Sequence, residues 1–109
     1  MQPHKREILH CSVGGRNHFR EWLDALKDIA GVEAINKRLD RVEDGNFGDR
    51  RFVGAGVSEL RIHFGPGYRV YYGEDGPIVV LLLCGGDKGT QWRDIRRAQE
   101  LWDAYRRSR

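Results

Sequence analysis

The spacing of apolar residues changes part-way along the chain, and this change limits the fold more than any other feature. Between residues 17 and 45 apolar side chains recur every three or four positions, which predicts amphipathic helices. From Val57 onward they alternate with polar ones, which predicts strands whose side chains point in turn to opposite faces of a sheet. Helices followed by a run of strands indicate an α+β fold.

The predicted elements follow the order strand, two helices, three strands, helix. We expect strands at residues 5–12, 57–64, 68–73 and 78–84, and helices at residues 17–29, 32–42 and from 91 onward. The first two helices are expected to separate at Ala30 and Gly31 and to form a hairpin, with Arg38 among the residues on the outer face. Thr90 is a candidate cap for the last helix.

The sheet is expected to be an antiparallel meander of about four strands, because tight turns at residues 65–67 and 74–77 join its last three strands. The strand at residues 78–84 is apolar at every position, as in a central strand covered on much of both faces. Helices gathered on one face would leave the other face partly open, and that open face is where we expect function to lie.

Size and composition exclude several classes of protein. The chain has 109 residues, which fits a single domain over residues 1–109. No apolar run approaches the roughly 20 residues of a membrane-spanning helix, and no secretory signal is recognisable, so a cytoplasmic location is expected. Cys11 and Cys84 stand alone, and the histidines show no ligand spacing, so we expect neither a metal site nor a cofactor.

The basic charge lies near the end of the chain. The net charge is +3, and residues 88–109 carry seven basic and three acidic side chains. Such a surplus suits a polyanionic partner, but a solvated basic helix without a partner has the same composition.

One face of the predicted sheet carries a set of catalytic residue types. Glu59, Arg61 and His63 alternate on one strand, and the neighbouring strand adds Arg69 and Tyr71 to the same face. Cleavage of a phosphodiester without metal needs a base for the attacking 2′-hydroxyl, fixed cations for the developing charge and an acid for the leaving oxygen. The alternative is a solvated sheet face on which Glu59 neutralises an arginine.

Five segments of the chain resemble the addiction-module killer proteins, the HigB-like, phage-related branch of the RelE/ParE toxin superfamily. These segments are FREWLDALKD (19–28), GNFGD (45–49), GVSELRI (56–62), GPGYRVYY (65–72) and LLLCGGDK (81–88), followed by Gln91, Asp94 and Ile95. They occur in the order that the family shows, over residues 5–105. The resemblance implies a RelE-like fold, a curved antiparallel sheet with two N-terminal helices packed on it.

The resemblance also implies a function. Members are toxins of type II toxin–antitoxin pairs, neutralised by a protein antitoxin that is often a helix-turn-helix DNA-binding protein and that brings the pair to its operator DNA. Many relatives are metal-independent endoribonucleases that cut mRNA on the ribosome. The candidate catalytic residues are then Glu59, Arg61, Arg69 and Lys88, of which Arg69 matches the transition-state arginine. The candidate RNA-binding residues are Arg51, His63, Tyr71 and Arg93, and the candidate antitoxin-binding residues are Trp92 and Trp102.

The sequence departs from several relatives at one point. They place a tyrosine or histidine just after the last strand as acid or base, and residues 85–91 contain neither. Cleavage would then require Glu59 or His63 as base and Lys88 or Tyr71 as the acid or as charge stabilisation. Two alternatives remain open: a non-catalytic, ParE-like toxin that acts on DNA gyrase, and an inactive toxin that serves as a binding module with its antitoxin.

Overall fold

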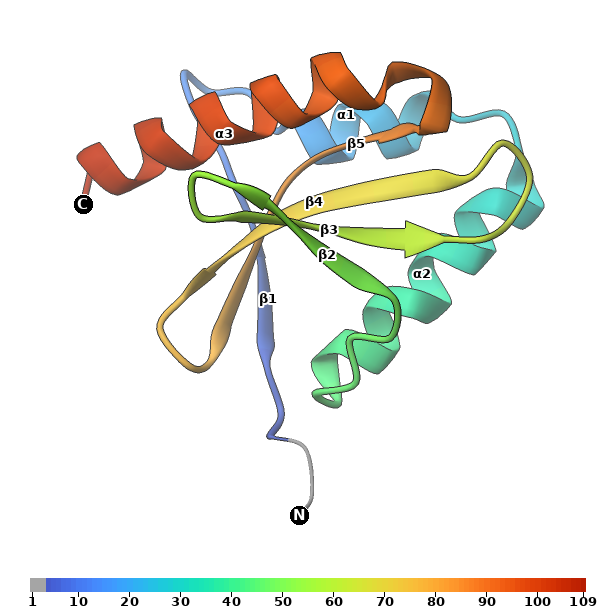
Figure 1. Cartoon of the computed structure of the whole chain (residues 1–109), viewed down its shortest axis with the longest axis horizontal. Helices are drawn as coiled ribbons and strands as arrows, with labels where there is room; N and C mark the ends of the chain where they lie inside the picture. The colour runs from blue at the N-terminus through green and yellow to red at the C-terminus, as the bar shows by residue number, and fades with distance from the viewer. Residues whose placement is uncertain (1–3) are drawn as a thin grey trace.

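A computed structural model describes residues 4–109, which form one sheet with helices packed on it (Figure 1). The strands are β1 (Glu7–His10), β2 (Arg50–Gly54), β3 (Val57–Ile62), β4 (Tyr68–Asp75) and β5 (Val79–Asp87). The helices are α1 (His18–Ala25), α2 (Ile29–Glu43) and α3 (Gln91–Arg107), and the short 3₁₀ turn η1 (Lys88–Thr90) leads into α3. The α+β fold and the predicted order are confirmed, with one strand added.

The sheet has five strands in the order β1-β5-β4-β3-β2 and is mixed. Strands β2 to β5 form the expected antiparallel meander, but β1 pairs parallel to β5. The two helices between β1 and the meander make this possible, because a parallel neighbour needs a long crossover. The sequence prediction omitted β2, whose residues Arg50, Arg51 and Phe52 are all exposed and so carry no alternation between buried and exposed positions.

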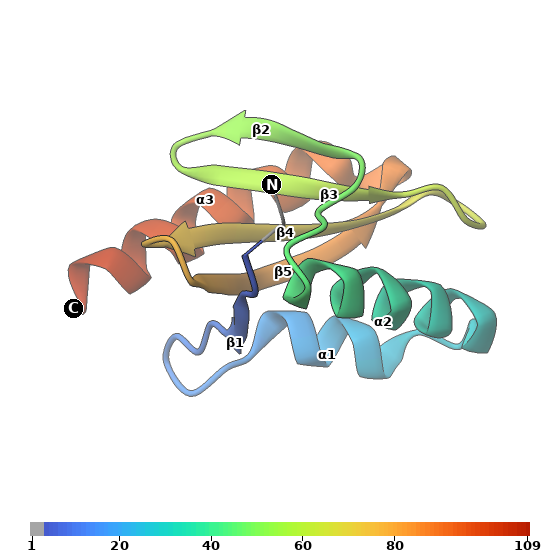
Figure 2. The ribbon, with the colours of Figure 1, turned by 90° about the horizontal axis from the view of Figure 1, so that it is seen from below.

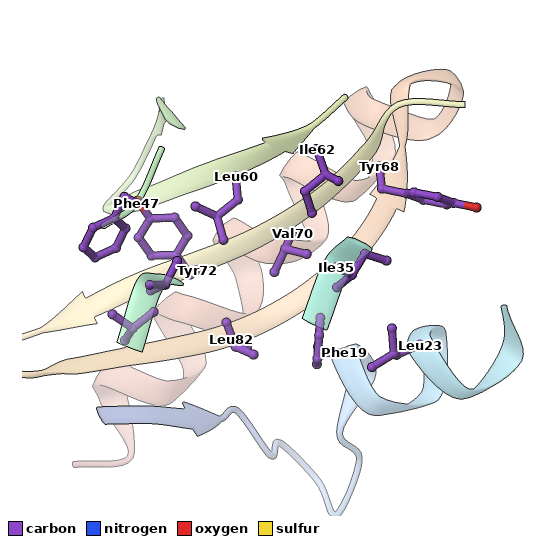
Figure 3. Packing of buried hydrophobic residues seen from close by; sticks show 12 residues of the cluster. Phe19, Leu23, Ile35, Phe47, Leu60, Ile62, Tyr68, Val70, Tyr72 and Leu82 are labelled. Carbon is purple, nitrogen blue, oxygen red and sulfur yellow. The ribbon is translucent and has the colours of Figure 1, made fainter. Parts of the chain in front are cut away.

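Helices cover both faces of the sheet. In Figure 2, α1 and α2 lie side by side on one face, and α3 lies on the opposite face. A core of twelve buried residues fills the space on the α1–α2 side, including Phe19, Ile35, Leu60 and Tyr72 (Figure 3). A second core, with Val57, Leu83 and Trp102, lies beneath α3. The hairpin on one face is as predicted, whereas the expectation of a partly open second face is wrong, because the apolar stripe of α3 packs on it.

The break between α1 and α2 falls earlier than predicted. Helix α1 ends at Ala25, and Asp28 caps α2 by accepting a hydrogen bond from the Gly31 amide at 3.0 Å. The other oxygen of Asp28 accepts from the Tyr68 hydroxyl at 2.7 Å, which ties the start of α2 to β4. A Cβ at Gly31 would lie 2.6 Å from Asp28 and 2.7 Å from Tyr68, so this glycine permits close packing within the first turn rather than breaking the helix.

Arg38 joins α2 to the sheet, although the sequence pattern placed it on the outer face. Its side chain is buried and donates to three backbone carbonyls, those of Phe47, Asp49 and Arg61. Because three carbonyls satisfy the guanidinium, the arginine is tolerated inside and fixes the path of the chain into β2.

The start of α3 also differs from the prediction. The Thr90 side chain does not cap this helix; instead its hydroxyl binds the carboxylate of Asp94. Asp87 caps the preceding turn by accepting from the Gly89 amide at 2.8 Å. None of the helices in the described part of the chain is long and apolar enough to cross a membrane.

Candidate active site

Strand register brings five of the predicted site residues together. Glu59 on β3 pairs with Tyr71 on β4, and Arg61 pairs with Arg69. Arg51 on the edge strand β2 pairs with Glu59 from the other side. Paired residues point to the same face of a sheet, and here that face carries α3. We call Glu59, Arg61, Arg69, Tyr71 and Gln91 of α3 the Glu59 cluster.

Glu59 is the centre of this cluster and has no exposed surface. Both of its carboxylate oxygens lie 3.0 Å from the Gln91 side-chain nitrogen, which donates to them. The Arg61 Nε lies 3.7 Å from the same carboxylate. A buried carboxylate needs such partners, so Glu59 ties the first residue of α3 to the sheet through hydrogen bonds and attracts Arg61 by charge alone.

Gln91 was not a predicted site residue, although it belongs to the segments that carry the family resemblance. It is 32 residues away from Glu59 in sequence. No local sequence pattern indicates such a contact. Only a prediction that the start of the last helix packs against the middle of a strand could have suggested it.

Arg69 and Tyr71 are also enclosed. Arg69 is 3% exposed, and its Nη1 donates to the carbonyls of Gly67 and Tyr68 at 3.2 Å each. The Tyr71 side chain has no exposed surface, and its hydroxyl has no hydrogen-bond partner within residues 4–109. Burial, together with the nearby Glu59 carboxylate, raises the pKa of Tyr71 far above its ordinary value. In this conformation neither Glu59 as a base nor Tyr71 as an acid can reach a substrate in solvent.

Cationic side chains remain accessible around the start of α3. Arg51, Lys88 and Arg93 are exposed, and the Arg61 side chain is 32% exposed. We call these four residues the basic rim. Guanidinium and ammonium groups at a surface can bind phosphate, and arginine can do so through two parallel hydrogen bonds.

His63 lies apart from the cluster. Strand β3 ends at Ile62, so the alternation that placed His63 beside Arg61 stops one residue too early. The exposed imidazole Nε2 contacts the Asp49 carboxylate at 2.6 Å, and the pair holds the pKa of Asp49 below its ordinary value. His63 lines a groove of about 440 Å³ along α2 instead.

The two tryptophans predicted to bind an antitoxin have different environments. Trp102 is 6% exposed and stacks on Tyr105 in the core beneath α3, with ring centroids 5.7 Å apart. A Cβ at Gly56 or Gly73 would lie 2.4 Å from its ring, so these glycines make room for it. Because it is buried, Trp102 is a packing residue in this conformation, whereas Trp92 is 89% exposed.

A second pocket, of about 360 Å³, lies between α1, the end of β5 and α3. Its lining mixes cations, such as Arg16 and Arg97, with the carboxylates of Glu21 and Asp94. Burial, followed by Arg16 and Arg97, holds the pKa of His18 below its ordinary value. Within residues 4–109, no three His, Cys, Asp or Glu side chains are grouped so as to hold a metal ion.

Comparison with known proteins places the chain in a family. An uncharacterized protein of Haemophilus influenzae is 48% identical to it over 83 residues, which are 76% of this chain and 84% of that protein. The chain belongs to the family of this protein. No family model matches the sequence. No solved structure matches it either. This relationship assigns no activity to the chain.

Proposed function

We propose that the protein is the toxin of a type II toxin–antitoxin pair and cuts mRNA on the ribosome without a metal. It would act in the cytoplasm, and a protein antitoxin of the helix-turn-helix type would neutralise it and carry it to operator DNA. The observation that supports this most is the Glu59 cluster, in which one buried carboxylate lies beside the partly exposed Arg61 and accepts from Gln91 at the start of α3. The sheet with two N-terminal helices packed on one face is also compatible with the fold that the HigB-like resemblance implies.

The site suggests roles for these residues that differ from those predicted from the sequence. Arg61 and Lys88 are accessible and would stabilise the charge that develops on the phosphate when the 2′-oxygen attacks it. Glu59 would position Arg61 and α3, because both of its oxygens already accept from Gln91. Arg69 would add positive charge from beneath the rim.

The test is primer extension on a reporter mRNA in a purified translation system. The wild type should cut the message only when ribosomes are present, and Arg61→Ala should lower the cleavage rate by about a hundredfold. Lys27→Ala is the matched control, since Lys27 is exposed but lies outside the basic rim. Message that stays intact with the wild type would refute the nuclease.

A second candidate function is favoured by one observation. Glu59 and Tyr71 have no exposed surface and Arg69 is 3% exposed, which fits a structural ion-pair network beneath α3. The protein would then be a non-catalytic, ParE-like toxin of DNA gyrase, or an inactive toxin that acts as a binding module with its antitoxin. Inhibition of gyrase supercoiling with intact mRNA would support the first of these, and absence of any toxicity the second.

A further inference from the structure

Trp92 is the most exposed of the large apolar side chains in the described part of the chain. It is 89% exposed, whereas Trp102 is 6% exposed and Trp22 packs beside the core on the α1–α2 side. An indole exposed to this extent buries little surface within the fold and is available for contact with another molecule.

The Glu59 cluster fixes where this indole lies. The Glu59 carboxylate contacts Gln91 on α3 and Arg61 on β3, and Trp92 follows Gln91 directly. The start of α3 is thereby held beside Arg61, with Trp92 at the surface.

Helix geometry shows which flank of α3 carries Trp92. Gln99 follows it by seven residues, or about two turns, and so lies on nearly the same side of the helix. The Gln99 side-chain nitrogen donates to the Val53 carbonyl of β2 at 3.0 Å. Trp92 therefore lies on the flank of α3 that faces β2, the strand that carries Arg51.

The surroundings of Trp92 are cationic. Arg51 and Lys88 are exposed, the Arg61 side chain is partly exposed, and the exposed Arg96 follows Trp92 by one turn of α3. The carboxylate at the centre of the group, Glu59, is buried and accepts from Gln91. An aromatic face surrounded by cations is the arrangement that binds single-stranded nucleic acid, because bases stack on the ring while phosphates contact the cations.

We propose that Trp92 is a binding residue on which an unpaired base of RNA stacks, with the adjoining phosphates held by Arg51, Arg61 and Arg96. This inference rests on the proposed function, since it assigns RNA as the ligand of the same region. Every base has a flat aromatic face, so the contact would tolerate different sequences.

The experiment compares two single-stranded ligands of equal charge, a fluorescein-labelled decaadenylate and an abasic decamer with the same ribose-phosphate backbone. Binding to the full-length protein is measured by fluorescence anisotropy at low salt. Trp92→Ala should bind decaadenylate about fivefold or more weakly than the wild type and the abasic decamer equally well. Trp92→Phe, which keeps an aromatic ring, should retain most of the affinity.

Ile29→Ala is the matched control, because Ile29 is 77% exposed at the start of α2, outside the basic rim, and should not affect RNA binding. Equal affinity of the wild type and Trp92→Ala for decaadenylate would overturn the inference. An equal loss of affinity for both ligands would also overturn it, since stacking requires a base. Failure of the wild type to bind either ligand would overturn it as well. In each of these cases Trp92 would not be a site of base stacking, and its remaining role would be contact with a protein partner.

The two proposals fail in different ways. If the wild type binds decaadenylate through Trp92 but leaves ribosome-bound mRNA intact, the nuclease proposal is refuted and the base-stacking proposal stands. If the wild type cuts mRNA and Trp92→Ala binds decaadenylate as tightly as the wild type, the base-stacking proposal is refuted and the nuclease proposal stands.

Discussion

The two faces of the sheet are lined by different kinds of residue. The α1–α2 face is mainly apolar, and two polar links join α2 to the rest of the fold there, the hydrogen bond of Tyr68 to Asp28 and those of the buried Arg38 to three backbone carbonyls. The α3 face has an apolar core that includes Leu83, Ala98 and Trp102, and it also carries the charged Glu59 cluster at the start of the helix. We therefore expect the first face to contribute more of the stability of the fold, and we expect substitutions in the Glu59 cluster on the second face to cost less.

The largest effect should come from the apolar face. Leu60 is fully buried there, next in sequence to Glu59 but on the opposite side of the sheet. Leu60→Ala should lower the free energy of unfolding by about 2–5 kcal/mol, because it removes buried contacts and leaves a cavity. Urea denaturation measures this, and Phe52→Ala, at a residue that is 66% exposed, is the control. Equal losses for the two variants would contradict the assignment of this face as the main core.

The next effect should come from the Glu59 cluster. Gln91→Leu removes the donor to both oxygens of Glu59 and should cost about 1–3 kcal/mol of stability, since a buried carboxylate loses its partner. The double variant Glu59→Leu with Gln91→Leu should recover most of the loss, because the buried carboxylate is then gone and Arg61, its remaining ionic neighbour, is 32% exposed and can be solvated. A double variant less stable than Gln91→Leu alone would show instead that the ion pair of Glu59 with Arg61 stabilises the fold.

A smaller effect should depend on pH. The hydrogen bond from Tyr68, followed by that from the Gly31 amide, holds the pKa of Asp28 below its ordinary value of 3.8. A carboxyl whose pKa is lower in the folded than in the unfolded state contributes stability above the unfolded pKa and loses it as the pH falls through the folded pKa. Wild type should therefore exceed Asp28→Asn in melting temperature at neutral pH, and the difference should shrink below about pH 4. A difference that is independent of pH would contradict this account of the cap.

The smallest effect should come from Tyr71. Its buried hydroxyl has no hydrogen-bond partner in the part of the chain that the structure describes. Tyr71→Phe should therefore change the free energy of unfolding by less than about 1 kcal/mol, with a slight gain expected. A loss well above that value in urea denaturation would mean that the hydroxyl has a partner, such as a bound water.

Much of the fold could be predicted from the pattern of apolar residues. The strands β3, β4 and β5 and the hairpin of α1 and α2 follow from their periods. Residues 78–84 predicted a strand covered on both faces, and β5 is covered in this way, by the α1–α2 core and by α3. That same run conflicted with the expectation of an open face, and the apolar stripe of α3 shows which of the two expectations was right.

The candidate site could be predicted only in part, because burial of charge depends on partners distant in sequence. Alternation correctly put Glu59, Arg61, Arg69 and Tyr71 on one face. It could not show that Gln91 would enclose Glu59, since that contact spans two elements. Arg38 was misplaced for the same reason, because three backbone carbonyls from other segments make its burial possible.

The central claim is that the basic rim acts on RNA, and Lys88→Ala tests it most directly. Lys88 is exposed, so its removal should leave the melting temperature unchanged. Ribosome-dependent cleavage of a reporter mRNA by this variant, measured beside the wild type, should fall by about tenfold or more, because a cation beside the reacting phosphate is lost. Cleavage at the wild-type rate with an unchanged melting temperature would contradict the account.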